Sequence, residues 1–129
     1  MKYNWDWQIF AQLEPGARVL EVGTGLGFLT LHLLRVPSEL VTVEVDPRLY
    51  ELSGRALASE RPCTRVFGDV LDGKHALAPQ VLAALWNDEP WHLVSNLPYS
   101  IASPLLVILA DLPNPPSSFT VLVQKEAAE

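Results

Sequence analysis

The sequence predicts a doubly wound α/β fold built on a mainly parallel sheet. Short aliphatic runs alternate along the chain with segments of helical periodicity, and this alternation is typical of β-α-β units. The strand candidates are apolar on both faces, which indicates a sheet that helices cover on both sides. Right-handed crossovers then place ligands at the carboxyl ends of the strands.

The first half of the chain contains three strand candidates separated by helices. Glu14-Pro15-Gly16 ends the first helix and Pro37 ends the second, because proline and glycine interrupt helical periodicity. Pro47 stands where the first turn of the third helix begins. In chain order, the predicted elements are a helix over 4–13, a strand over 17–22, a helix over 28–36, a strand over 40–45, a helix from 47 to about 59 and a strand over 64–67.

The second half continues the alternation with two more strands. A helix is predicted over 79–86 and a strand over 91–95. A helix over 104–112 follows, with a proline at its first turn. A strand over 119–123 comes after a proline-rich connector and completes the expected sheet of five strands.

Composition restricts the class of protein. Hydrophobic residues make up 49% of the chain and charged residues 19%, as in a globular domain. No apolar run reaches the roughly 18 to 20 residues that a membrane-spanning helix needs, and the N-terminus lacks the apolar core of a signal peptide. The single cysteine, Cys63, fits a reducing cytoplasm, and the three histidines show no metal-ligand spacing. We therefore expect a cytoplasmic protein with no membrane partner and no metal.

The net charge of −6 bears on nucleic-acid binding. A protein that binds nucleic acid alone usually carries a basic patch, because phosphate neutralisation supplies much of its affinity. This chain has nine lysines and arginines in all, and they are scattered. If the substrate is RNA, another segment or protein must therefore supply much of the RNA-binding affinity.

A glycine cluster closes the first predicted strand and opens the helix after it. Glycines allow the backbone to approach a ligand, and the helix N-terminus offers amide donors. A dinucleotide fingerprint would place its third glycine at position 28, which is Phe28 here. The Gly-x-Gly-x-Gly spacing suits S-adenosylmethionine, which has no pyrophosphate; the alternative is a tight turn without a ligand. The segment reads Glu21-Val22-Gly23-Thr24-Gly25-Leu26-Gly27.

Two carboxylates follow the next two strands. Glu44 ends the second strand, where a carboxylate can accept both hydroxyls of a ribose. Asp46 is the competing candidate, but it precedes Pro47 and is better placed to cap the next helix. Asp69, after the third strand, stands where a carboxylate can accept from the amino group of the cofactor adenine; the alternative is a turn residue beside Gly68.

The segment Asn96-Leu97-Pro98-Tyr99 follows the fourth predicted strand. The Asn96 side-chain oxygen and the Leu97 carbonyl can accept the two hydrogens of an exocyclic amine. That turns the nitrogen lone pair toward a methyl donor and stabilises the developing positive charge. Tyr99 can stack on a base that has left its helix. The alternative is an ordinary strand-to-helix loop with a buried tyrosine.

Together these motifs resemble the ribosomal RNA adenine dimethyltransferases of the small-subunit, kasugamycin-resistance type. The resemblance implies an S-adenosylmethionine-dependent methyltransferase (Rossmann-like) fold and catalysis by Asn96, Leu97, Pro98 and Tyr99. The matching segments are 21–30, 43–46, 68–71, 96–106 and 123–129. The cofactor-binding residues that it implies are Glu21, Gly23, Thr24, Gly25, Leu26, Gly27, Glu44, Val45, Asp69, Val70 and Asn96.

The resemblance also implies an activity and a partner. It implies transfer of two methyl groups to each target adenosine in small-subunit rRNA, as part of ribosome maturation. Members of the family have an N-terminal segment that closes over the cofactor, and a C-terminal helical domain. We expect residues 1–129 to be the cofactor-binding core without these parts, and the uncovered sheet edge to support self-association.

Two other functions stay open. One is a cofactor-binding or assembly factor without methylation activity, which the acidic charge favours. The other is a methyltransferase for an amine in DNA, protein or a small molecule, since Pro98-Tyr99 is shared among amine methyltransferases.

Overall fold

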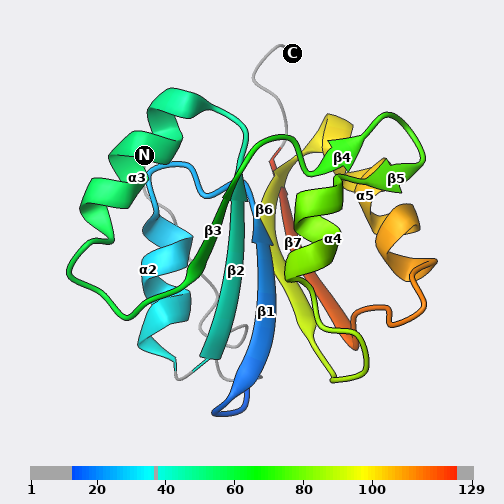
Figure 1. The fold of residues 1–129 in the computed structure, drawn as a ribbon, viewed down its shortest axis with the longest axis horizontal. Helices are drawn as coiled ribbons and strands as arrows, with labels where there is room; N and C mark the ends of the chain where they lie inside the picture. Colours follow the sequence, from blue (N-terminus) through cyan, green and yellow to red (C-terminus); the bar gives the residue numbers. More distant parts are fainter. Residues whose placement is uncertain (1–12, 37, 125–129) are drawn as a thin grey trace.

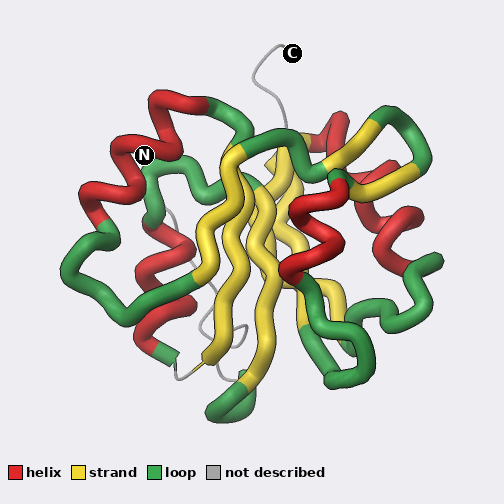
Figure 2. Tube along the Cα trace, viewed as in Figure 1, coloured by secondary structure: helices red, strands yellow, loops and turns green. Residues whose placement is uncertain are grey.

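The computed structural model describes residues 13–36 and 38–124, which form a five-stranded sheet between two layers of helices (Figures 1 and 2). All neighbouring strands in this sheet are parallel, and their order is β3-β2-β1-β6-β7. The predicted doubly wound fold is confirmed. The strands are β1 (Ala17–Val22), β2 (Ser38–Glu44), β3 (Thr64–Phe67), β6 (His92–Pro98) and β7 (Ser118–Gln124).

Two helices lie on each side of the sheet. Helices α2 (Phe28–Arg35) and α3 (Pro47–Ala56) cover one face, and α4 (Pro79–Ala84) and α5 (Tyr99–Ala110) cover the other (Figure 1). Each face has its own apolar cluster. The cluster under α2 includes Val19, Leu33 and Leu40. The cluster under α4 and α5 includes Leu20, Leu93 and the fully buried Trp91.

The strand order reverses between β1 and β6. Strand β2 follows β1 on one side, whereas β6 and β7 lie on the other side (Figure 1). Strands β1 and β2 pair along their whole length, from Ala17 with Ser38 to Val22 with Val43. Strands β1 and β6 pair only through Val19 with His92 and Leu20 with Leu93. At their carboxyl ends the two strands therefore do not pair with each other, and this is the point where doubly wound folds bind ligands.

Three expectations about the elements need correction. The helix expected over 104–112 begins at Tyr99, and Pro104 lies inside it rather than in its first turn. Burial of Ala102, Leu105 and Leu109 stabilises this helix although Pro104 provides no amide hydrogen. Strand β6 continues to Pro98, three residues beyond its predicted end, because it pairs with β7 as far as Gln124.

The third correction concerns the loop before α4. It contains a small antiparallel hairpin of β4 (Leu71–Asp72) and β5 (Ala76–Leu77), which the sequence pattern did not predict. The helix predicted over 4–13 lies almost entirely outside the described residues. Each helix in the described part of the chain is too short or too polar to cross a lipid bilayer.

Candidate functional site

The predicted site residues meet at the carboxyl ends of four strands. The glycine loop follows β1, Glu44 ends β2, Asp69 follows β3, and Asn96 lies in β6 (Figure 1). Because these strands are parallel and adjacent, the four segments share one edge of the sheet. The site therefore forms from residues that are spread over most of the described sequence.

The glycine loop has a backbone that other residues rarely adopt. Gly23, Gly25 and Gly27 have φ angles of 87°, 58° and 94°, in the left-handed region that favours glycine. The amides of Gly23 and Thr24 donate to the carbonyl of Val43 at 2.7 and 3.2 Å, which ties the loop to β2. Gly27 is the N-cap of α2, and no side chain caps this helix end. The positive end of the α2 dipole therefore faces the site.

Glu44 connects the end of β2 to this loop. Its Oε1 accepts from the amide of Gly25 at 2.6 Å and its Oε2 from the amide of Asp46 at 2.9 Å. The side chain is 5% exposed. Each carboxylate oxygen has further lone pairs, so the group can still accept hydroxyl donors from a ligand. Asp46 caps α3, as predicted: its Oδ1 accepts from the amides of Arg48 and Leu49.

Glu21 lies beneath the loop, in a small polar network that the sequence analysis did not find. Thr30 and Thr42 both donate to its Oε1, at 2.5 and 2.7 Å. The hydroxyls of Thr42 and Thr24 are 2.6 Å apart; since Thr42 donates to Glu21, Thr24 donates to Thr42. Glu21 thus supports the glycine loop through a chain of two hydrogen bonds, from Thr24 in the loop to Thr42 and from Thr42 to Glu21. The sequence feature that could have indicated this network is a threonine within each of the apolar segments that form α2 and β2.

Burial changes the acidity of Glu21. Desolvation raises its pKa to about 7, and the nearby charge of Glu44 adds to the increase, although the hydrogen bonds from Thr30 and Thr42 lower it. The Oε2 atom of Glu21 is buried and has no hydrogen-bond partner among the described residues. A carboxyl group in this setting changes its charge near neutral pH. A direct contact of Glu21 with a cofactor stays a prediction.

The turn after β3 contains the second predicted carboxylate. Asp69 is exposed, and its Oδ1 accepts from the amide of Leu71 at 3.0 Å, as a turn residue would. The amide of Gly68 donates to the carbonyl of Glu44 at 2.8 Å, which places this turn beside the end of β2. Val45 is 58% exposed at the same edge, whereas Val70 is buried in the core.

Asn96 presents the most unusual polar atom of the site. Its Oδ1 is buried and has no hydrogen-bond partner among the described residues. Its backbone carbonyl oxygen lies 3.7 Å from the position that a Cβ atom would take on Gly23. Asn96 therefore lies against the start of the glycine loop, with an unused acceptor. Buried acceptors normally find a donor, so an unpaired one at a strand end is a candidate ligand contact.

The rest of the predicted catalytic segment is divided between β6 and α5. Leu97 is buried, and Pro98 is the exposed N-cap residue of α5. Tyr99 is the first residue of α5; its side chain lies outside the described part of the structure, so its predicted stacking stays a prediction.

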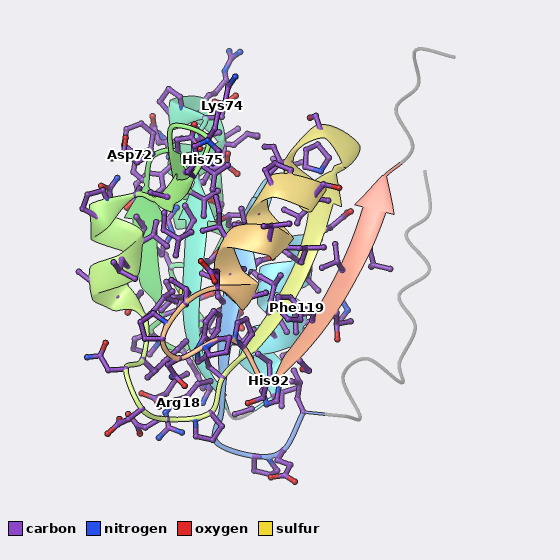
Figure 3. All side chains as sticks on the ribbon, turned by 90° about the vertical axis from the view of Figure 1, so that its right-hand side faces the viewer. Arg18, Asp72, Lys74, His75, His92 and Phe119 are labelled. Atoms are coloured by element: carbon purple, nitrogen blue, oxygen red, sulfur yellow. The ribbon has the colours of Figure 1, made fainter. Side chains whose placement is uncertain are left out.

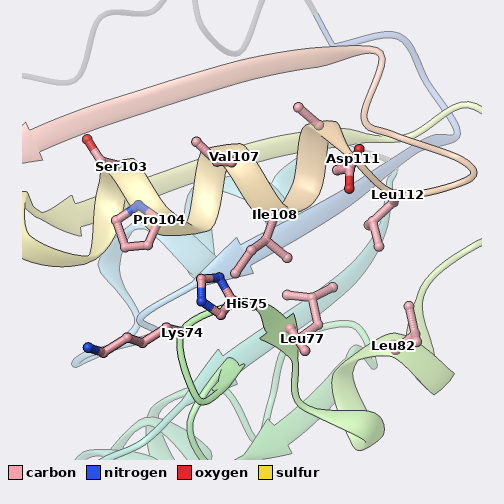
Figure 4. A pocket seen from close by; sticks show the side chains of 12 residues that line it. Lys74, His75, Leu77, Leu82, Ser103, Pro104, Val107, Ile108, Asp111 and Leu112 are labelled. Atoms are coloured by element: carbon pink, nitrogen blue, oxygen red, sulfur yellow. The ribbon is translucent and has the colours of Figure 1, made fainter.

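A separate groove of about 920 Å³ lies between the β4–β5 hairpin and α5 (Figure 4). Leu77 and Ile108 line it, with Lys74 and His75 beside Pro104 near one end. None of the predicted site residues lines this groove. In the described part of the chain, no group of three or more His, Cys, Asp and Glu side chains forms a metal-binding cluster.

Comparisons with curated proteins give a consistent result. The model of a family described as "Ribosomal RNA adenine dimethylase" matches residues 8–129. "Ribosomal RNA small subunit methyltransferase A" of Phenylobacterium zucineum is 40% identical over 119 residues, which is 92% of this chain and 39% of the relative. The protein of the same name from Geobacter sulfurreducens is 36% identical over 111 residues, which is 86% of this chain and 39% of the relative. The chain thus spans less than half the length of these relatives.

Solved structures share the fold. The 23S rRNA methyltransferase ErmE is 26% identical with a TM-score of 0.66, and the match covers 88% of this chain and 42% of that one. A dimethyladenosine transferase from Plasmodium falciparum is 24% identical with a TM-score of 0.66, and the match covers 92% of this chain and 40% of that one. The five-stranded sheet with its helices is therefore the Rossmann-like fold of such enzymes.

Proposed function

The chain belongs to the ribosomal RNA adenine dimethylase family, and we propose that it binds S-adenosylmethionine for methyl transfer to the exocyclic amine of adenosine in small-subunit rRNA. The observation that carries this proposal is the unpaired, buried Oδ1 of Asn96, a residue whose backbone lies against Gly23. It is an acceptor for an amine, placed at the point between β1 and β6 where the fold binds ligands.

The residues at the strand ends fit this cofactor. The glycine loop leaves room for a ligand at Gly25, where an added Cβ would meet no atom within 4 Å. Glu44 can accept the ribose hydroxyls, and Asp69 is exposed at the neighbouring turn. The remaining proposed contacts belong to the same loop and strand ends and are Glu21, Thr24, Gly25, Leu26, Gly27, Val45 and Val70.

The residues of this chain contribute to the proposed methyl transfer mainly by orienting the adenosine amine. When bound, S-adenosylmethionine supplies a methyl group on a positively charged sulfur. Asn96 Oδ1 and the Leu97 carbonyl accept the two hydrogens of the adenosine amine, which directs the nitrogen lone pair toward that methyl group. The same two acceptors stabilise the positive charge that develops on nitrogen. Pro98, as N-cap of α5, limits the conformations of the turn that leads to Tyr99.

The acidic charge of the chain bears on the RNA partner. With a net charge of −6, the chain alone offers little phosphate neutralisation. We propose that the part described here is a cofactor-binding core, and that rRNA or the small ribosomal subunit is held largely by other segments or proteins. The same charge favours the second candidate function, a cofactor-binding or assembly factor that does not methylate.

Strand β7 suggests one more contact. It is an outer strand of the sheet among the described residues, and its Phe119 is 42% exposed (Figure 3). An open edge can pair with a strand of another molecule. We propose that this edge supports self-association, which sedimentation of the purified chain over a range of concentrations would detect.

Transfer of labelled methyl groups to unmethylated small ribosomal subunits tests the main proposal. We expect slow transfer with the unchanged chain, because it neutralises few phosphates on its own. Asn96→Ala should lower this rate by about 100-fold, and Asn87→Ala, at an exposed asparagine after α4, should leave it unchanged. Cofactor binding measured by calorimetry separates the two candidate functions. Binding without transfer would favour the non-methylating factor, and full transfer by Asn96→Ala would contradict the role of Asn96.

A further inference from the structure

We infer that Ser95 is a positioning residue for Asn96, because its hydroxyl replaces the main-chain pairing that β1 and β6 lack at their carboxyl ends. The inference rests on the proposed function for its effect on catalysis. The structural connection itself can be tested without any activity.

The missing main-chain pairing between β1 and β6, called the gap below, is confined to the carboxyl ends of these two strands. Strand β6 pairs with β7 along its whole length, from His92 with Ser118 to Pro98 with Gln124. Its pairing with β1 ends at Leu20 with Leu93, although β1 continues to Val22. The last residues of β1 therefore lack main-chain partners in β6.

The Ser95 hydroxyl spans this gap. It donates to the carbonyl of Val22 at 2.7 Å and accepts from the amide of the same residue, also at 2.7 Å. One side-chain oxygen thus satisfies both polar backbone groups of Val22. Ser95 is 1% exposed, so removal of the hydroxyl would leave both groups buried without this partner.

The position of Ser95 in the strand makes this role specific. Leu93 and Leu97, two residues before and after it, both belong to the apolar cluster on the α5 side. An aliphatic residue would therefore suit the packing at position 95. A buried hydroxyl is costly unless it is hydrogen-bonded, and here both of its hydrogen bonds go to Val22.

The hydrogen bonds between Ser95 and Val22 join the glycine loop to the strand that carries Asn96. Val22 immediately precedes Gly23, and Ser95 immediately precedes Asn96. The Asn96 carbonyl oxygen lies 3.7 Å from the Cβ position of Gly23, so the two backbones are close at this level. The hydroxyl therefore holds the backbone that enters the glycine loop against the backbone that carries Asn96 and its unpaired Oδ1. A shift of about 1 Å at such a contact reduces catalysis strongly.

Amide hydrogen exchange, followed by NMR on the whole chain, tests the connection directly. In Ser95→Ala we expect the Val22 amide to exchange about tenfold faster and the side-chain amide signals of Asn96 to move. Ser95→Thr keeps a hydroxyl on the same carbon and should restore the protection of Val22. Ser53→Ala is the matched control, because Ser53 is also fully buried but lies in α3, away from the site. It should leave both signals unchanged.

Methyl-transfer kinetics test the effect on catalysis. Ser95→Ala should lower kcat about tenfold and leave the KM for S-adenosylmethionine within about threefold of the original value. If this variant does not fold, Ser95→Cys, which offers only a weak donor, replaces it in both experiments. Unchanged exchange at Val22 would overturn the inference, as would unchanged kcat despite faster exchange. If the unchanged chain transfers no methyl groups, the proposed function fails, and the exchange and Asn96 signals alone decide whether Ser95 positions Asn96.

Discussion

Glu44 and Gly25 are joined by a 2.6 Å hydrogen bond between the end of β2 and the loop that follows β1. The second carboxylate oxygen of Glu44 holds the amide of Asp46, which caps α3. A single carboxylate thus fixes the glycine loop relative to the start of α3. In the proposed function the same group also accepts the ribose hydroxyls of the cofactor, so its loss should affect binding in two ways.

We expect Glu44→Ala to weaken S-adenosylmethionine binding by about 10- to 100-fold, because charge-assisted hydrogen bonds to the ligand and to the loop are both lost. Isothermal titration calorimetry measures the change. Glu51→Gln is the control: Glu51 is an exposed carboxylate in α3 that pairs with Arg55. It should bind the cofactor as tightly as the unchanged chain. Equal affinity of all three proteins would exclude Glu44 from the site.

Two glycines allow backbone strain to be separated from function. Gly23 and Gly16 have similar φ angles of 87° and 84°, and a Cβ atom would meet nothing closer than 3.7 Å at either. Gly23→Ala and Gly16→Ala should therefore each lower the free energy of unfolding by about 1 to 2 kcal/mol, measured in urea. Only Gly23→Ala should also weaken cofactor binding. Equal binding by both variants would show that the loop does not contact the cofactor near Gly23.

Glu21 makes stability depend on pH. Its folded pKa is about 7, above the ordinary value of 4.5, because burial disfavours the charged form. The folded state therefore holds a proton that the unfolded state releases between these two values. The contribution to stability is complete below pH 4.5 and is lost as the pH rises through 7, by about 3 kcal/mol in total.

Glu21→Gln removes this titration. We expect the unchanged chain to lose stability relative to the variant between pH 5 and pH 8, with the difference measured by urea unfolding at both values. Other titrating groups are common to both proteins and cancel in the comparison. Parallel stability curves would mean that Glu21 keeps an ordinary pKa in the folded chain.

Much of the fold follows from local patterns. The strands over 17–22 and 64–67 were predicted with their observed bounds, because aliphatic and β-branched runs are enclosed there by glycine, proline and polar residues. Helix α5 was predicted to start too late, because Pro104 reads as a first-turn residue while tertiary burial decides the true start. The β4–β5 hairpin has strands of two residues each, too short to show any periodicity.

The candidate site, like the fold, could be predicted from the sequence only in part. Glu44, Asp69 and Asn96 could be predicted to lie near one another, because residues at the carboxyl ends of adjacent parallel strands meet at one edge of the sheet, whereas their contacts with a cofactor stay a prediction. Glu21 and Thr42 pair across 21 positions, and Ser95 and Val22 across 73 positions. Such contacts depend on side-chain direction and on the local separation of two strands, which no sequence pattern contains.

Thr42→Val tests the polar network under the glycine loop. The variant keeps the shape of the side chain but removes the hydroxyl that donates to Glu21 and accepts from Thr24. At pH 8, where Glu21 is mostly charged, we expect a loss of about 2 kcal/mol in the free energy of unfolding. At pH 5, where Glu21 is neutral, the loss should be about 1 kcal/mol, since hydrogen bonds to charged groups are stronger.

Urea unfolding of this variant, of Glu21→Gln and of the double variant gives the coupling between the two residues. We expect the coupling to be larger at pH 8 than at pH 5, because only the charged carboxylate depends strongly on the Thr42 donor. The same loss at both pH values would mean that the hydroxyl acts on the loop through Thr24 alone. In that case the double variant should lose no more and no less than the sum of the two single variants.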